Sequence, residues 1–316
     1  MNIFRFVPCM VMALGMLASC QQSESADQPS EGKTLGIQAS VSNPQLSRTV
    51  ISGETTSFVD GDRIGFFMPD VDSPTLWTRE GGNWSSSSQL FWPDLVSEFV
   101  FDAFYPYEEG TVAVRNSIPM PDISRQTGKL DDLGKYDFLV ARTSCSYTTS
   151  QGGTVSFTGE SAFQHKYSLV RLIFKNGNDD DLSLTRLNLN GTDIVSKCTY
   201  DMVGNRIQKD EGEPSVNELT VDCGSAVVPE SGYTLAVLLN PSTAEEAVSL
   251  TLSYVRGEKS YTASTEVTEH FESGKLYQYT VTVQKEGLVI KVGEVADWNT
   301  GTVLDDIVIK DESDQP

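Results

Sequence analysis

The sequence predicts an all-β protein built as two β-sandwiches packed end to end. No long window shows the 3.6-residue apolar period of an amphipathic helix, whereas short runs of alternating or continuous apolar residues recur along most of the chain. Turn-forming residues separate these runs at the short, regular spacing that is typical of β-sandwiches. The loop Thr149-Ser150-Gln151-Gly152-Gly153 is the best candidate for a boundary between two domains.

The first expected element is a half-buried strand at residues 35–41. Leu35, Ile37, Ala39 and Val41 alternate there with Gly, Gln or Ser, which is the two-residue period of a strand with one apolar face. Further strands are expected in the first domain at residues 63–67, 76–79, 84–86, 99–105 and 136–141. In the second domain they are expected at residues 154–157, 169–174, 184–190, 218–222, 233–239, 249–255, 261–264, 276–283 and 289–292.

The first 20 residues are typical of a lipoprotein signal peptide. Arg5 supplies a positive charge, residues 6–17 are apolar but too few to span a bilayer, and the run closes at Leu17-Ala18-Ser19-Cys20. Small residues before a cysteine favour lipidation of Cys20, and the acyl chains would anchor the mature chain in a membrane. The alternative is an ordinary signal peptide with an incidental cysteine. Gln21 stands where an Asp would signal inner-membrane retention, so outer-membrane delivery is expected.

Composition bounds the rest of the chain. Residues 21–33 are polar and read as a flexible tether, and no later stretch is long and apolar enough for a membrane helix. We therefore expect domains at 34–150 and 151–310 and a polar tail at 311–316. The net charge of −21 argues against nucleic acid and anionic lipid surfaces as partners, and it suits a soluble extracellular face.

Five segments, in their order and spacing behind the lipidation motif, resemble the fimbrillin family of Bacteroidetes. This family comprises pilus subunits and their anchor and tip partners. The segments are Asp60-Gly61-Asp62-Arg63-Ile64-Gly65-Phe66-Phe67, Phe101-Asp102-Ala103-Phe104-Tyr105-Pro106-Tyr107, Tyr136-Asp137-Phe138-Leu139-Val140-Ala141, Phe163-Gln164-His165-Lys166-Tyr167-Ser168-Leu169-Val170 and residues 292–298. The resemblance implies two transthyretin-like antiparallel β-sandwich domains in tandem, a role in surface fimbriae and no enzymatic activity.

The resemblance also implies assembly by strand donation between subunits. A trypsin-like protease would cut after Arg48, before Thr49, and release the strand that carries Leu35, Ile37, Ala39 and Val41. The loss would leave unpaired backbone groups and empty apolar pockets for a neighbour's strand to fill. Burial of four such side chains is worth on the order of 4–10 kcal/mol. The alternative for Arg48 is a solvated loop arginine.

The expected donor strand lies at residues 302–310. Val303, Ile307 and Ile309 share one face of it, but Asp305 interrupts that face. The interruption leaves open whether the chain is a polymerising shaft subunit, a tip component that accepts a strand, or an anchor that keeps its lipid. The expected partners are other fimbrial subunits, the outer membrane through Cys20, and an unidentified host protein or glycan.

Three tryptophans suggest an alternative function, namely the binding of sugars. Trp77, Trp84 and Trp92 gather in one stretch and would suit an aromatic platform for sugars on a monomeric surface lipoprotein. The alternative is that they are core or strand-edge aromatics beside a hairpin.

No catalytic residue, metal ligand set or cofactor motif is expected. The two histidines stand apart, and His165 is better explained as a structural histidine at a strand end. Asp60, Asp62 and residues 179–181 lack the spacing of a calcium loop, and no serine or cysteine has an evident base partner. Three cysteines remain after the signal, namely Cys145, Cys198 and Cys223; the last two either pair or stay as buried thiols.

Overall fold

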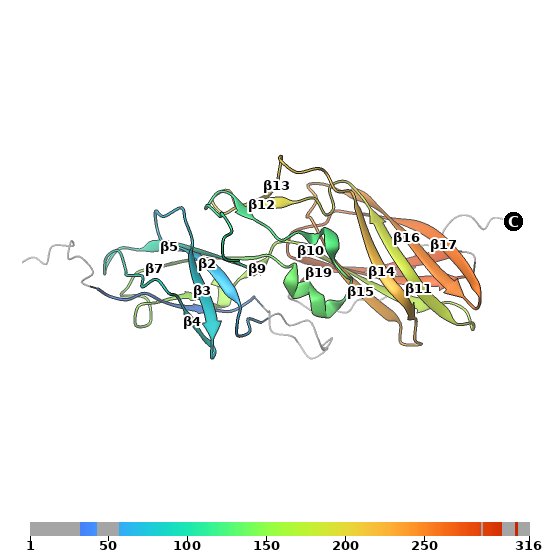
Figure 1. Ribbon diagram of the computed structural model, residues 1–316, viewed down its shortest axis with the longest axis horizontal. Coiled ribbons are helices and arrows are strands. Elements are labelled where there is room, and N and C mark those ends of the chain that lie inside the picture. Colours follow the sequence, from blue (N-terminus) through green and yellow to red (C-terminus); the bar gives the residue numbers. More distant parts are fainter. Residues whose placement is uncertain (1–31, 43–56, 286, 299–306, 309–316) are drawn as a thin grey trace, which may run out of the picture.

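The computed structural model describes residues 32–42, 57–285, 287–298 and 307–308. Within them the regular structure is almost entirely β-strand, with three short 3-10 helices, so the prediction of an all-β fold is confirmed. The molecule is elongated, with one lobe at each end of its long axis (Figure 1). No helix of the described residues is long and apolar enough to cross a membrane.

The first lobe consists of two unequal layers. A six-stranded antiparallel sheet has the order β4-β3-β2-β5-β7-β9, and the other layer is β1 paired with β8 in parallel. The strands are β1 (Gly36–Ala39), β2 (Arg63–Phe67), β3 (Thr75–Glu80), β4 (Asn83–Ser85), β5 (Phe99–Tyr105), β7 (Leu139–Cys145), β8 (Thr154–Phe157) and β9 (Gln164–His165). A cluster of mostly aromatic side chains fills the space between the layers.

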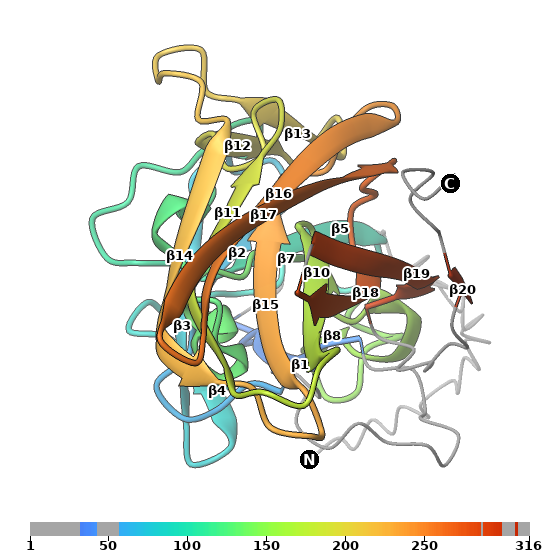
Figure 2. The same ribbon diagram turned by 90° about the vertical axis from the view of Figure 1, so that its right-hand side faces the viewer.

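The second lobe is a sandwich of a five-stranded and a four-stranded sheet, which face each other in Figure 2. One sheet has the order β15-β10-β18-β19-β20 and the other β14-β11-β16-β17. The strands are β10 (Ser168–Asn176), β11 (Leu182–Asn190), β14 (Glu218–Val227), β15 (Tyr233–Leu239), β16 (Glu246–Arg256), β17 (Lys259–Glu269), β18 (Lys275–Gln284), β19 (Gly287–Asp297) and β20 (Ile307–Val308). All neighbours are antiparallel except β10 and β18.

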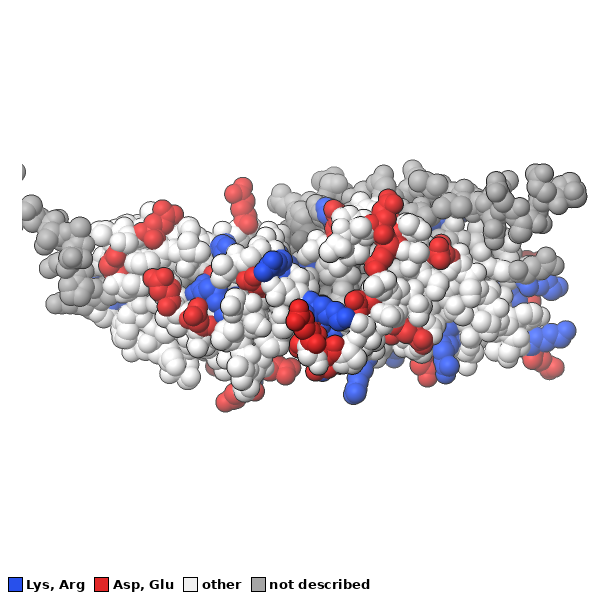
Figure 3. Space-filling view, turned by 90° about the horizontal axis from the view of Figure 1, so that it is seen from above, with Lys and Arg blue, Asp and Glu red and all other residues white. Residues whose placement is uncertain are grey.

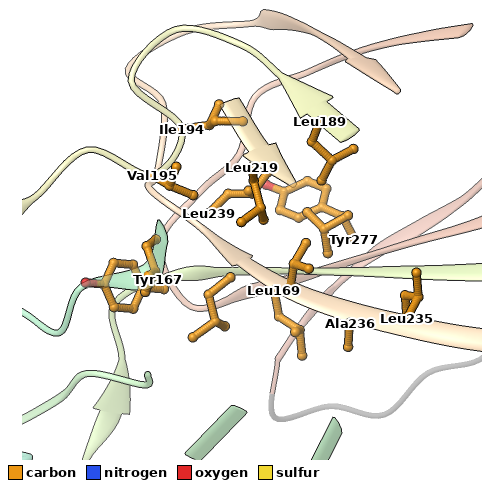
Figure 4. Close-up of a cluster of buried hydrophobic side chains, with 14 of the residues drawn as sticks. Tyr167, Leu169, Leu189, Ile194, Val195, Leu219, Leu235, Ala236, Leu239 and Tyr277 are labelled. Carbon is orange, nitrogen blue, oxygen red and sulfur yellow. The ribbon is translucent and has the colours of Figure 1, made fainter. Parts of the chain in front are cut away.

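Alternation along the strands builds the core of the second lobe. In β16, Val248, Leu250, Leu252 and Tyr254 are buried and the residues between them are half-buried, which follows from the two-residue period of a strand. Figure 4 shows side chains from both sheets meeting in this core. β10 is buried along most of its length, and residues earlier in the chain, such as Ile118 and Phe138, belong to the same hydrophobic cluster.

The region between the lobes is made by short elements. β6 (Ile118–Pro119), β12 (Cys198–Asp201) and β13 (Arg206–Lys209) form a three-stranded sheet. The 3-10 helices are η1 (Ile123–Arg125), η2 (Leu130–Lys135) and η3 (Gly159–Ser161), and η1 and η2 pack against β14 and β15 of the second lobe. The chain therefore crosses between the lobes more than once.

The two hydrophobic cores divide the chain differently from the boundary predicted in the loop at residues 149–153. Val155, Phe157 and Phe163 follow that loop but belong to the core of the first lobe. Ile118 and Ile123 precede the loop but belong to the core of the second lobe. Short apolar segments carry no sequence signal for which core they enter, so tertiary packing decides this division.

Candidate functional site

The candidate site is the opening strand β1 and the surface that holds it. β1 runs parallel to β8, with Ile37 opposite Val155 and Ala39 opposite Phe157. The pairing continues beyond β1, because the Ser42 N–H donates to the Phe163 carbonyl oxygen at 2.8 Å.

Backbone hydrogen bonds hold the start of this segment on both sides. On one side the Gly36 N–H donates to the Gly153 carbonyl oxygen at 3.1 Å. On the other side the Leu35 N–H donates to the Leu90 carbonyl oxygen at 2.9 Å, and the Trp92 N–H donates to the Lys33 carbonyl oxygen at 3.0 Å. The segment is thus inserted between two stretches of the first lobe.

The side chains of the opening strand enter the aromatic core. Leu35, Ile37 and Val41 are 2%, 8% and 6% exposed, and Ala39 is half-buried against the same cluster. Gln38, which points the other way, is exposed. The segment therefore has the one-sided apolar character that its sequence pattern predicts.

The surface beneath β1 is aromatic. Phe66, Phe157 and Phe163 form edge-to-face contacts, with ring centroids 6.1 Å apart for Phe66–Phe157 and 5.8 Å apart for Phe157–Phe163. Trp92 is 1% exposed and its indole N–H donates to the Gly153 carbonyl oxygen at 2.9 Å. Because β1 and β8 are the only strands of their layer in the described residues, loss of β1 would expose much of this surface and one edge of β8.

Several predicted site residues lie outside the described residues. These are the lipidation residue Cys20, the cleavage residues Arg48 and Thr49, and the donor residues Val303 and Ile309. The third donor residue, Ile307, lies in β20, where it is paired with Val292 at the edge of the second lobe.

The tryptophans do not form an exposed platform. Trp77 is 5% exposed and Trp92 1% exposed, both within the core of the first lobe. Trp84 is half-buried and packs edge-on against Phe58, with ring centroids 5.2 Å apart. Burial of an aromatic ring in a core is more favourable than its exposure to water. The hypothesis of an exposed three-tryptophan platform for sugars is therefore wrong.

The titratable residues noted in the sequence have structural partners. His165 is buried, and its Nδ1 lies 2.7 Å from Asp137 Oδ2. Asp60 accepts hydrogen bonds from the backbone N–H groups of Gly81 and Gly82, each at 3.1 Å, and so caps the β3–β4 turn. The described part of the chain contains no group of three or more potential metal ligands.

The three cysteines of the described residues are free thiols. Cys198 lies on β12 and Cys223 on β14, which belong to different sheets, and of the two alternatives for this pair the structure shows the buried thiols. Burial raises the pKa of each of these two thiols to about 11, because a thiolate is poorly solvated there.

Sequence reasoning missed the partner of the opening strand. Val155 and Phe157 of β8 alternate with polar residues and were expected to form a strand, but nothing local indicates that this strand runs parallel to a segment more than a hundred residues earlier. It also missed Asp102 as a buried charge, although the apolar residues around Asp102 in β5 were a usable signal.

Comparisons with known proteins point to one family. A family model described as fimbrillin-like matches residues 48–298. A solved structure from Bacteroides uniformis, provisionally assigned to cell adhesion, is 20% identical, with a TM-score of 0.60 over 84% of this chain and 99% of that one. A second, from Bacteroides ovatus with the same provisional assignment, is 18% identical, with a TM-score of 0.56 over 84% and 98%. These identities show a shared fold. No curated protein matches the chain.

Proposed function

The chain belongs to the fimbrillin-like family, and from that membership we propose that it is a structural or adhesive component of cell-surface fimbriae. In this proposal the chain is exported as a lipoprotein, is anchored in the outer membrane through Cys20, and joins other subunits after its opening strand is removed. The proposed partners are neighbouring fimbrial subunits, and no catalytic step is involved.

The observation that carries the proposal is the packing of the opening strand. Leu35, Ile37 and Val41 are buried in the core of the first lobe. They nevertheless belong to a short strand, and within the described residues this strand has only one partner in its layer. A strand from another subunit with the same alternation of apolar and polar residues can fill the same pockets and form hydrogen bonds with the same backbone groups of β8.

The family match supports the position of the cut. It begins at Arg48, so β1 lies before the matched region and β2 to β19 lie within it. Cleavage between Arg48 and Thr49 would separate β1 from the remainder of the chain. The donor in this proposal is the segment at residues 302–310, of which Ile307 and Val308 form β20 at a sheet edge. β20 is the last strand of its sheet within the described residues and pairs there only with β19, so its release would break the pairing with a single neighbour.

Limited proteolysis tests the cut. The purified precursor is treated with trypsin under native conditions, and the new N-terminus is sequenced. We expect Thr49 at the new N-terminus, and we expect Arg48→Gln to block this product while Arg125→Gln, a matched change at an exposed arginine, leaves it unchanged. Survival of the Arg48–Thr49 bond under conditions that nick other loops would contradict the proposal.

Assembly is tested separately from cleavage. Cleaved wild-type chain should form ladders on gels run without boiling, because complemented strands resist dissociation. The Arg48→Gln variant should stay monomeric, and electron microscopy should place labelled wild-type protein on shafts or tips. Label confined to the cell body, together with monomers after complete cleavage, would favour a monomeric surface lipoprotein instead.

A further inference from the structure

A polar cavity of about 650 Å³ lies where the first lobe meets the second. Its walls come from segments far apart in the sequence: the end of the opening strand, β9, the β12–β13 hairpin and two loops of the second lobe. The residues that the argument uses are Ser42, Gln164, His165, Lys166, Asn205 and Arg206. A smaller adjoining cavity of about 220 Å³ shares Gln164, Lys166 and Asn205 with it, so the hollow continues across the joint.

The charge of this cavity is opposite to that of the chain. The protein has a net charge of −21, and Figure 3 shows acidic side chains spread over both lobes on one face. Among the described residues, however, the lining of the larger cavity includes Lys166, Arg206 and Lys275 and no Asp or Glu. Arg206 is paired with Asp201 and Lys275 is engaged in an interaction of its own, so the cation that remains to attract a small anion is Lys166.

Lys166 is the central cation. It lines both cavities, its Nζ lies 5.4 Å from the centre of the Tyr200 ring, and it makes no ion pair with any described residue. Burial lowers the pKa of Lys166, because its ammonium group has lost water without gaining a carboxylate. Arg206, by contrast, is paired with Asp201 at 3.3 Å. An anion at Lys166 would supply the missing counter-charge.

Hydrogen-bonding groups surround this cation. The Tyr200 hydroxyl donates to Asn205 Oδ1 at 2.5 Å, which leaves the amide N–H groups of Asn205 available to a ligand. His165 has a fully buried side chain; its Nδ1 is engaged by Asp137, and its Nε2 has no partner in the described structure. The His165 ring also stacks on Trp298, with ring centroids 3.8 Å apart, so this histidine is a fixed part of the cavity wall.

We propose that this cavity binds a small polar molecule that carries an oxyanion, such as a carboxylate or phosphate group, with Lys166 as its counter-ion and Asn205 as a hydrogen-bond donor. The volume exceeds that of a phosphate ion and suits a molecule of sugar size. The site goes beyond the proposed fimbrial function. It is present in the intact chain, where Ser42 at the end of the opening strand forms part of its wall, so it requires neither cleavage nor assembly.

Calorimetric titration of the uncleaved chain tests the site. The probes are glucuronate, inorganic phosphate and uncharged glucose at matched ionic strength. We expect saturable binding of glucuronate, of phosphate or of both, and none of glucose. Preference for glucuronate would identify a sugar acid as the occupant, and preference for phosphate would identify a phosphorylated molecule; either result supports an oxyanion site.

Variants separate this site from general charge effects. Lys166→Met keeps the aliphatic stem and removes the charge, so affinity should fall by about tenfold or more. It should also raise the melting temperature of the unliganded protein slightly, because a half-buried ammonium group without a carboxylate partner among the described residues is lost. Lys175→Met makes the same change at an exposed lysine and should alter neither quantity.

If Lys166→Met does not fold, Asn205→Ala serves as the second variant, and its affinity for the anion should also be lower than that of the wild type. Absence of saturable binding of either anion to the wild-type chain would overturn the proposal. Equal affinity in wild-type and folded Lys166→Met protein would overturn it as well. Neither result would bear on strand exchange, which the proteolysis and assembly experiments test on different residues.

Discussion

At the scale of single residues, the structure explains why particular side chains stand in the segments that resemble fimbrillins. Gly65 lies in β2 directly opposite Phe104 of β5, and a Cβ on residue 65 would overlap the Phe104 ring. The glycine therefore allows a buried aromatic ring to lie flat across the neighbouring strand. Asp137 and His165, from two other segments, form a buried hydrogen-bonded pair.

Replacement of Gly65 tests this close packing. Gly65→Ala should lower the free energy of unfolding by about 1–3 kcal/mol, because Phe104 must move in a filled core. Gly134→Ala is the matched control: Gly134 is exposed in η2 and a Cβ there meets nothing within 4 Å. Urea unfolding measures both variants, and equal midpoints would contradict the argument.

The buried thiols make a second residue-scale prediction. At about pH 8, a thiol with a pKa of about 11 is ionised in only about one molecule in a thousand, so Cys198 and Cys223 should resist alkylation in the native protein. The partly exposed Cys145 should react faster, and denaturant should make all three react. Mass spectrometry of labelled peptides locates the products. A peptide that joins Cys198 to Cys223 by a disulfide would contradict the structure.

The same thiols predict how stability depends on alkaline pH. Below the ordinary thiol pKa of about 9, both the folded and the unfolded chain hold neutral thiols. Above it the unfolded chain ionises first, so these two groups should lower the free energy of unfolding as pH rises toward about 11. The Cys198→Ala variant should show a smaller loss over this interval than the wild type.

At the scale of elements, β1 shows how local pattern and long-range pairing combine. Its alternation is visible in the sequence and determines which side chains face the core. Its parallel partner β8 is set by the two-layer packing of the first lobe, since a strand alone does not specify the direction of its neighbour.

Truncation of one inward side chain tests the contribution of this element. Leu35→Ala should lower the free energy of unfolding of the first lobe by about 2–5 kcal/mol, because it leaves a cavity among aromatic rings. Gln38→Ala, on the exposed face of the same strand, should change it by no more than about 0.5 kcal/mol. Native-state hydrogen exchange of β8 amides gives an independent measurement. Equal protection in the two variants would contradict tight packing of β1.

At the scale of the whole molecule, a buried charge cluster ties the lobes together. Asp102 in β5 is 1% exposed and pairs with Arg115 and with Arg142, the latter at 2.6 Å. Arg142 also donates to the carbonyl oxygen of Met202, between β12 and β13, at 2.9 Å. One carboxylate of the first lobe thus positions an arginine that reaches the joint with the second.

Neutralisation of this carboxylate should be costly. Asp102→Asn leaves two arginines without their counter-charge and should lower the free energy of unfolding by about 3 kcal/mol, at the low end for a buried pair because Arg142 is half exposed. Asp179→Asn makes the same chemical change at an exposed turn and should have little effect. Urea unfolding followed by far-ultraviolet circular dichroism compares them. An Asp102→Asn variant with the same free energy of unfolding as the wild type would show that the cluster contributes little net stability.

Much of the fold could be predicted from local pattern, and part of the candidate site as well. Strands such as β5, β10 and β16 follow directly from apolar runs and alternation, and the inward residues Leu35, Ile37 and Val41 of the opening segment were identified by period alone. The burial of Trp77 and Trp92 could not be predicted, because a tryptophan beside a hairpin suits a surface as well as a core.

By itself, the sequence determined the all-β class, the positions of most strands and which face of each is apolar, because these depend on the two-residue period of an extended chain. Only the tertiary structure decided that β1 pairs in parallel with β8, that Ile118 and Val155 enter opposite cores, and that Lys166 lies beside His165 in a cavity between the lobes. These features depend on contacts between residues far apart in the chain, and packing energy acts on the assembled molecule rather than on any one segment.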